Sequence, residues 1–187
     1  MWLISAWLVL SSVCLHIATA DNENCFNGLK ELQVLSLRNA FQDSRHIISN
    51  LTKAFTHSSF ESLQELRLDD NDFGVIGRDL FLFDGGKRSV VERISLRNCS
   101  LTYIQKGTFK TELMPELNYI DLSMNRIEEI TDEQGFLSAL DSFGNQLSIN
   151  LTGNPFNCNC DLELFRTWLN DTKVHIVDKH SIDMSQG

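Results

Sequence analysis

Three consecutive segments of this chain repeat one pattern of apolar and polar positions. In each segment two apolar residues alternate with polar ones, and further apolar residues follow at the same offsets. Strict alternation is the pattern of a half-buried β-strand, because successive side chains of a strand point to opposite faces. The three segments are LQELRLDDNDFGVIGRDLF from Leu63, VERISLRNCSLTYIQKGTF from Val91 and ELNYIDLSMNRIEEI from Glu116.

Two weaker copies flank these segments, LQVLSLRNAF from Leu32 and SINLTGNPF from Ser148. The last leucine of each alternating run marks the period, and the spacings are 31, 28, 26 and 29 residues between Leu37, Leu68, Leu96, Leu122 and Leu151. Self-similarity at a period of 20–50 residues is the signature of a repeat architecture. We therefore expect about five stacked units.

These copies resemble the leucine-rich repeat family, whose consensus is L-x-x-L-x-L-x-x-N/C-x-L. The resemblance implies an α/β solenoid, with a curved parallel β-sheet on a concave face and with loops and short helices on a convex face. A buried polar residue follows each strand in this fold, where its side chain can satisfy backbone groups of adjacent turns. The residues at that position form a predicted repeat ladder of Asn71, Cys99, Asn125 and Asn154.

Two helices are predicted outside the repeat pattern. The insertion SRHIISNLTKAFTHSSF carries Ile48, Leu51 and Phe55 at helical spacing, which indicates one short helix packed under the first repeat. Near the end of the chain Asp161 is a candidate helix cap. The apolar face that follows consists of Leu162, Phe165, Trp168 and Leu169.

The domain organisation follows from the two ends of the chain. Residues 1–20 lack charged side chains and end in Ala18-Thr19-Ala20, which is typical of a cleaved secretory signal peptide; an uncleaved membrane anchor is the alternative. We expect a short N-terminal cap over residues 21–31, repeats over 32–156 and a partial C-terminal cap over 157–187. No later segment has the length of a membrane span, so the mature product is expected to carry no membrane segment.

The cysteines at the two ends, Cys25, Cys158 and Cys160, depart from the family pattern. The resemblance implies a cysteine-rich C-terminal cap with two further cysteines downstream, and no cysteine follows Cys160. Five strands about 4.8 Å apart separate the ends by roughly 20 Å, too far for a disulfide between Cys25 and the other two.

Three explanations of these cysteines stay open. The chain is a fragment or shortened product of a longer protein, or its thiols are free, mispaired or bonded to another chain in a disulfide-linked oligomer. The third is a zinc site from Cys158, Cys160, His175 and His180. The C-x-C spacing lacks the usual two-residue spacer, so no metal is expected.

Composition narrows the partners. The net charge of −9 argues against nucleic acid, heparin and anionic lipid. No nucleophile elbow, phosphate-binding loop or zinc-protease motif is present, so we expect neither catalytic residues nor a cofactor. Four N-glycosylation motifs suit a secreted, extracellular glycoprotein: Asn50, Asn98, Asn150 and Asn170.

The exposed strand positions are the candidate binding residues. They are Glu65, Arg67, Asp69, Arg93, Ser95, Arg97, Tyr119, Asp121 and Ser123, with Ser148, Asn150 and Thr152 on the last strand. Opposite charges are expected to neighbour each other on adjacent strands, Glu65 beside Arg93 and Asp69 beside Arg97. Such a surface is either mutually neutralised or a protein interface anchored by its arginines and tyrosine.

We conclude from the sequence that the chain is an extracellular binding module that recognises a protein through its concave face, in adhesion, receptor signalling or innate recognition as the resemblance implies. A glycan on Asn150 would confine that partner to the second to fourth repeats. The alternatives are a carrier of carbohydrate or a small ligand, a noncatalytic subunit of an extracellular complex, and a truncated fragment of a larger leucine-rich repeat receptor.

Overall fold

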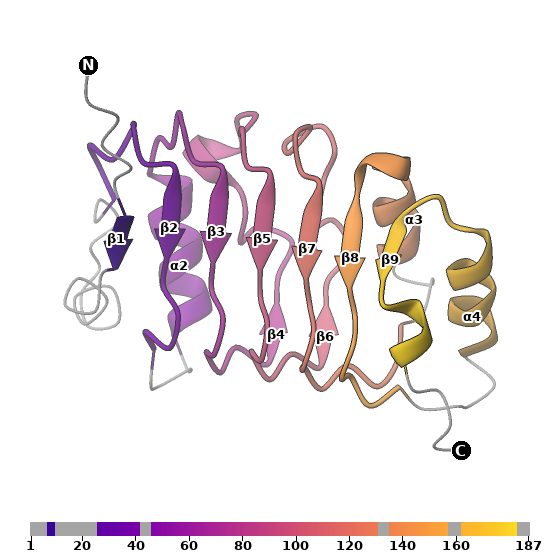
Figure 1. Ribbon diagram of the computed structural model, residues 1–187. Helices are drawn as coiled ribbons and strands as arrows, with labels where there is room; N and C mark the ends of the chain where they lie inside the picture. Colours follow the sequence, from indigo (N-terminus) through magenta and orange to yellow (C-terminus); the bar gives the residue numbers. More distant parts are fainter. Residues whose placement is uncertain (1–6, 10–25, 42–45, 131–134, 157–161, 183–187) are drawn as a thin grey trace.

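A parallel β-sheet of seven short strands runs through the molecule (Figure 1). The computed structural model describes residues 7–9, 26–41, 46–130, 135–156 and 162–182 of the 187-residue chain. The strands lie side by side in chain order and every neighbouring pair is parallel. They are β1 (Trp7–Val9), β2 (Val34–Ser36), β3 (Glu65–Arg67), β5 (Arg93–Ser95), β7 (Tyr119–Asp121), β8 (Ser148–Asn150) and β9 (His175–Val177).

The five predicted repeats each supply one strand, β2, β3, β5, β7 and β8. Each of these strands has three residues, of which the middle one is apolar and fully buried. These middle residues occupy one register across the sheet: Leu35, Leu66, Ile94, Ile120 and Ile149. The sheet is two strands wider than the repeats predict, because β1 lies in the expected leader and β9 in the expected C-terminal cap.

Loops and short helices form the second layer behind the sheet (Figure 1). The elements of this layer and of the C-terminal end are α2 (Ile47–Thr56), β4 (Val75–Ile76), η1 (Phe83–Gly85), β6 (Tyr103–Ile104), α3 (Phe136–Asp141), η3 (Gly144–Gln146), α4 (Leu162–Asp171) and η4 (Lys179–Ser181). Strands β4 and β6 pair in parallel as a second, two-stranded sheet. Long spacings between repeats are thus used as predicted, for helices and loops on the side opposite the sheet face.

Both predicted helices form. Helix α2 buries Leu51 and Phe55 as expected, but Ile47 is the buried isoleucine and Ile48 is only partly buried. Helix α4 buries Phe165, Trp168 and Leu169, and the rings of Phe156 and Phe165 lie 5.0 Å apart. The proposed cap Asp161 and the side chain of Leu162 lie outside the described residues, as do Cys25, Cys158 and Cys160.

Phenylalanine rings fill the space between the two layers. The ring centroids of Phe55 lie 5.8 Å from Phe26, 6.2 Å from Phe60 and 5.4 Å from Phe83. The series continues through Phe81, Phe109 and Phe136, with neighbouring centroids 5.5–6.4 Å apart. Within the described ranges no helix combines the length and the apolar character that a membrane crossing requires.

The predicted repeat ladder is confirmed by its hydrogen bonds. The Asn125 amide group donates to the carbonyl oxygens of Leu96 at 2.8 Å and Leu122 at 2.9 Å, and its Oδ1 accepts from the backbone N–H groups of Cys99 and Leu101. Asn71 makes the corresponding bonds to the preceding repeat. Each buried amide therefore joins two neighbouring repeats.

Cys99 takes the same position with different chemistry. Its thiol donates to the Leu68 carbonyl oxygen at 3.1 Å, as an asparagine would, but the sulfur does not replace the amide oxygen. The N–H of Phe73 donates to the Cys99 backbone carbonyl at 3.0 Å. The equivalent groups of Leu101 and Ile127 donate to the side chains of Asn125 and Asn154. The backbone thus supplies the acceptor that this side chain lacks.

We expect Cys99 to resist alkylation in the folded protein. Its side chain is fully buried, and burial raises the pKa of the thiol to about 12. At pH 8 its thiolate fraction is then lower than that of an ordinary cysteine by a factor on the order of 1,000. Mass spectrometry of the Cys99 peptide after iodoacetamide treatment should show labelling at least about a hundredfold slower in buffer than in guanidinium chloride.

The raised pKa also has a sign for stability. The unfolded chain releases the Cys99 proton at lower pH than the folded protein, so this contribution to stability is complete below about pH 8.5 and declines as pH rises toward 12. Equal labelling rates in buffer and in denaturant would contradict the buried position of this thiol.

Candidate functional site

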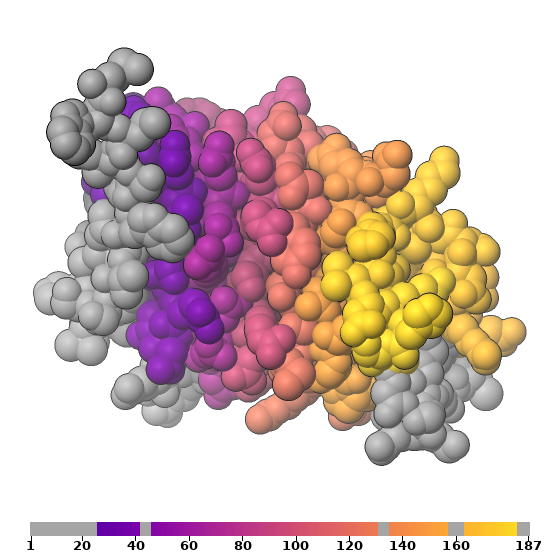
Figure 2. Space-filling model, in the orientation of Figure 1, coloured from indigo at the N-terminus to yellow at the C-terminus, as the bar shows by residue number. Residues whose placement is uncertain are grey.

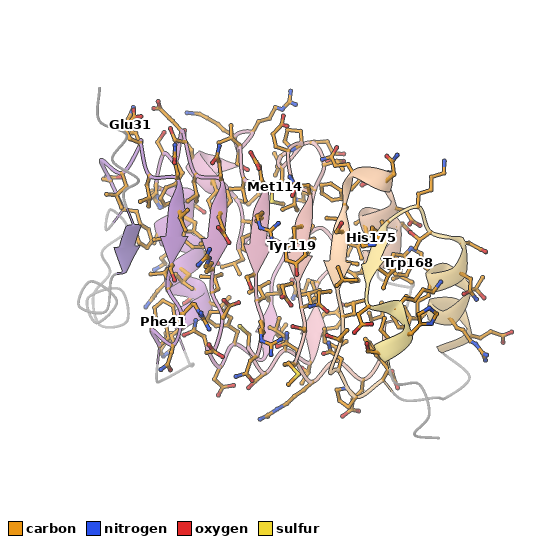
Figure 3. All side chains as sticks on the ribbon, viewed as in Figure 1. Glu31, Phe41, Met114, Tyr119, Trp168 and His175 are labelled. Carbon is orange, nitrogen blue, oxygen red and sulfur yellow. The ribbon has the colours of Figure 1, made fainter. Side chains whose placement is uncertain are left out.

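The candidate site is the face of the sheet that points away from the helices, which we call the open face. It is built from the first and third residue of each strand and from the residue two positions after the third. The register aligns Glu65, Arg93, Tyr119 and Ser148 in one row across the sheet, and Arg67, Ser95, Asp121 and Asn150 in the next. Figure 2 shows the repeats as successive bands across this view, and Figure 3 labels Tyr119 over β7 near the middle of the sheet.

Glu65 and Arg67 neutralise each other within β3. The guanidinium donates to both carboxylate oxygens, with Nε 2.8 Å from Oε1 and Nη2 3.0 Å from Oε2. This hydrogen bond raises the pKa of Arg67. The register places Glu65 beside Arg93 as predicted, but the carboxylate pairs along its own strand instead of across strands.

Asp69 is buried, which corrects the prediction that it is exposed; its side chain is 8% accessible. Its carboxylate accepts from the Arg97 backbone N–H at 3.0 Å and from the Ser95 hydroxyl. Arg97 is therefore its neighbour as expected, but through the main chain. The physical reason is the bend after the strand, where the N–H of the next repeat needs an acceptor.

Ser123 is also buried rather than exposed, with no accessible surface. Its Oγ accepts from Nη1 of Arg97 at 2.9 Å, so it supports the exposed arginine from below. Its backbone N–H donates to Oδ1 of Asp121 at 2.9 Å. Of the nine predicted positions on the second to fourth repeats, the two that follow β3 and β7 turn inward, and the corresponding Arg97 stays exposed.

Arg93 and Tyr119 form a cation–π pair at the centre of the open face. The guanidinium carbon of Arg93 lies 4.1 Å from the ring centroid of Tyr119, a geometry that attracts a cation to the face of an aromatic ring. Burial, followed by the charge of Asp121, raises the pKa of Tyr119. The phenol therefore stays neutral at physiological pH and can donate a hydrogen bond.

A depression of about 230 Å³ lies around this pair. Its lining consists of Arg38, Glu65, Arg67, Asp69, Arg93, Ile94, Ser95, Tyr119 and Asp121. Larger hollows of about 390 and 460 Å³ lie elsewhere, lined around Tyr103 and Ile130 in one case and around Phe60 and Lys87 in the other. The depression on the open face is distinguished by its converging charged and aromatic groups rather than by its size.

Arg38 is a member of the site that the sequence reasoning missed. It lies 2.9 Å from Asp70 and 3.4 Å from Asp69, measured between side-chain nitrogen and oxygen atoms. Hydrogen bonds from Asn98 and then Arg38 lower the pKa of Asp70. The repeat alignment held the signal, because Arg38 follows Leu37 as Asp69 follows Leu68. The first copy was left out of the candidate list because its pattern is weaker.

The N-glycosylation motifs differ in their surroundings. Asn98 and Asn170 are exposed, and Asn50 on α2 and Asn150 on β8 are half-buried. The Asn150 side chain accepts hydrogen bonds from the backbone and hydroxyl groups of Thr152, at 3.1 and 2.9 Å. Glycosylation at these four residues remains a prediction.

Metal binding at the C-terminal end also remains a prediction that the structure leaves open. His175 and His180 are exposed, and Cys158 and Cys160 lie outside the described residues. Among the residues that are described, no three histidine, cysteine or acidic side chains are grouped as metal ligands.

The stacked parallel strands and the asparagine ladder define the chain as a leucine-rich repeat solenoid. No protein-family model matches it. In sequence it is similar to a phospholipase A2 inhibitor of Gloydius brevicaudus siniticus, with 35% identity over 89 residues, which are 48% of this chain and 24% of the inhibitor.

Two solved structures share this fold. Human trophoblast glycoprotein superposes with a TM-score of 0.56 and 24% identity over 67% of this chain and 42% of its own. The mouse RP105/MD-1 complex contributes a chain with a TM-score of 0.51 and 21% identity, covering 88% of this chain and 29% of that one. The chain thus spans less than half the length of each of these proteins. The resemblance to extracellular leucine-rich repeat proteins is confirmed, and the cysteine-rich cap remains a prediction.

Proposed function

We propose that this chain is an extracellular module that binds a protein partner through its open face. The observation that carries the proposal is the Arg93–Tyr119 pair, which lies beside a depression in the middle of the sheet. Arginine and tyrosine are enriched among the residues that dominate protein interfaces. A stacked guanidinium and a half-buried phenol also lose little conformational freedom on binding.

The relatives support a protein as the partner. One is named for its inhibition of phospholipase A2, and one similar solved structure is a complex of RP105 with MD-1. Secretion fits the same picture, with residues 1–20 as a leader, 21–31 and 157–187 as caps and the four N-glycosylation motifs as glycan sites. A carrier of carbohydrate is the alternative, and sugar binding by the same depression would distinguish it.

We expect Tyr119→Ala to weaken binding at least tenfold. The secreted protein is applied to an array of cell-surface ectodomains and to an array of glycans, and affinities are measured for every molecule captured. Loss of the ring removes both the support of Arg93 and the phenol donor. Leu164→Ala is the control, because Leu164 is 58% exposed on α4 and away from the open face.

Tyr119→Phe separates the two contributions of this side chain, since it keeps the ring and removes the hydroxyl. Thermal unfolding of each variant verifies that the fold is retained. Capture of glycans alone, or ectodomain affinities that do not change in Tyr119→Ala, would overturn the proposal.

A further inference from the structure

We infer that the open face recognises a pair of carboxylates on an acidic, extended segment of its protein partner. This inference rests on the proposed function and specifies the chemistry of the partner. It is carried by the distribution of charge on the open face, where the acidic groups are already bonded within the protein and two arginines are not ion-paired.

The carboxylates of the open face are occupied by internal partners. Glu65 holds the guanidinium of Arg67 through two hydrogen bonds. Asp69 accepts from Ser95 and from the Arg97 backbone, and is buried. Asp121 accepts from the Ser123 backbone at 2.9 Å and lies 3.4 Å from the Tyr119 hydroxyl. These groups therefore offer little to a cationic partner.

Arg93 and Arg97 present the complementary feature. Both are exposed, and neither takes part in an ion pair within the described part of the chain. Each is nevertheless held in place, Arg93 by stacking on Tyr119 at 4.1 Å and Arg97 by its hydrogen bond to Ser123 at 2.9 Å. A fixed guanidinium binds a carboxylate with two parallel hydrogen bonds and loses little freedom in doing so.

The spacing of the two arginines indicates the shape of the partner. They are four residues apart along an extended segment, which corresponds to about 13 Å at roughly 3.3 Å per residue. An extended peptide with acidic residues at positions i and i+4 has the same spacing. Its backbone would cross the Ser95 region between the arginines.

Protein carboxylates fit better than dense polyanions. The chain carries a net charge of −9, so heparin or nucleic acid is repelled over most of its surface. Two carboxylates on an otherwise neutral segment meet the local pair of cations with less repulsion. The distinction between carboxylate, sulfate and phosphate is therefore part of the test.

The test uses the secreted protein and three immobilised peptides of the form X-Ser-Thr-Ser-X, in which X is glutamate, glutamine or lysine. Heparin and a phosphoserine version of the peptide are the competing anions. Binding is measured for the wild type, for Arg93→Glu/Arg97→Glu and for the control Arg78→Glu/Arg166→Glu. The control makes the same change in net charge at two exposed arginines outside the open face.

We expect the wild type to bind the glutamate peptide at least tenfold more tightly than the glutamine peptide, and the control to behave like the wild type. The Arg93→Glu/Arg97→Glu variant should lose this preference and bind the lysine peptide instead. Arg93→Gln/Arg97→Gln, which removes the cations without reversing them, should bind none of the three. Thermal unfolding shows that each variant is folded.

Three results would overturn the inference: equal affinity for the glutamate and glutamine peptides, no measurable binding of either, or tighter binding of heparin or phosphoserine. The ectodomain array separates this failure from that of the proposed function. If Tyr119→Ala abolishes ectodomain capture while Arg93→Glu/Arg97→Glu leaves it unchanged, protein binding stands and the carboxylate assignment fails. If neither variant alters capture, both fail.

Discussion

Asn125→Ala is expected to lower the free energy of unfolding by roughly 3–5 kcal/mol. The substitution removes a buried amide that bonds two N–H groups, those of Cys99 and Leu101, and the carbonyl oxygens of Leu96 and Leu122. Alanine leaves all four backbone groups buried without this partner. Each unsatisfied buried group is unfavourable by about 1–3 kcal/mol, and water entering the small space left by the amide offsets only part of the loss.

Urea unfolding measures this change, with Asn145→Ala as the control. Asn145 is an exposed asparagine in η3, and its replacement is expected to alter stability by no more than about 0.5 kcal/mol. An effect of Asn125→Ala below about 1 kcal/mol would mean that the ladder does not hold the repeats together, and that the apolar core does so alone.

Phe55→Ala is expected to lower stability by about 3–5 kcal/mol through a different mechanism. Phe55 has no accessible surface, and its ring contacts those of Phe26, Phe60 and Phe83. Alanine leaves a cavity between α2 and the first repeats that these rings fill only in part. Phe55→Leu keeps most of the volume and should have a clearly smaller effect.

The loss should be local as well as large. In a repeat protein each unit contacts only its neighbours, so destabilisation of one end spreads incompletely to the other. Native-state hydrogen exchange of Phe55→Ala is expected to show reduced protection of α2, β2 and β3, while β8 and β9 retain theirs. Uniform loss of protection across all strands would contradict this distribution. Leu164→Ala, at an exposed position, supplies the control.

The sheet was largely predictable because each strand is marked by its own sequence. The alternation around Leu66, Ile94 and Ile120 fixes which residues are buried, and the polar residue after each strand fixes where the chain turns. Strand β9 was missed because His175–Val177 has one buried residue and lacks the leucine that follows the other strands. Helix α3 has only six residues, too few for a periodic pattern.

The site was predictable as a set of positions but not as a set of contacts. Repeat alignment places Glu65 beside Arg93, and the register agrees. Which carboxylate pairs with which guanidinium depends on side-chain conformation, and Arg67 reaches back to its own strand instead. The inward turn of Asp69 likewise follows from the backbone donor of Arg97, which the sequence does not display.

The common register of the strands gives the open face the properties of a scale with unequal marks. Neighbouring marks lie about 4.8 Å apart, and along one row they read Glu65, Arg93, Tyr119 and Ser148. A ligand carboxylate that slips by one strand from Arg93 meets either an anion or a phenol. The uniform stacking of the repeats, which the core requires, thus makes misaligned binding unfavourable by means of the side chains that the strands carry.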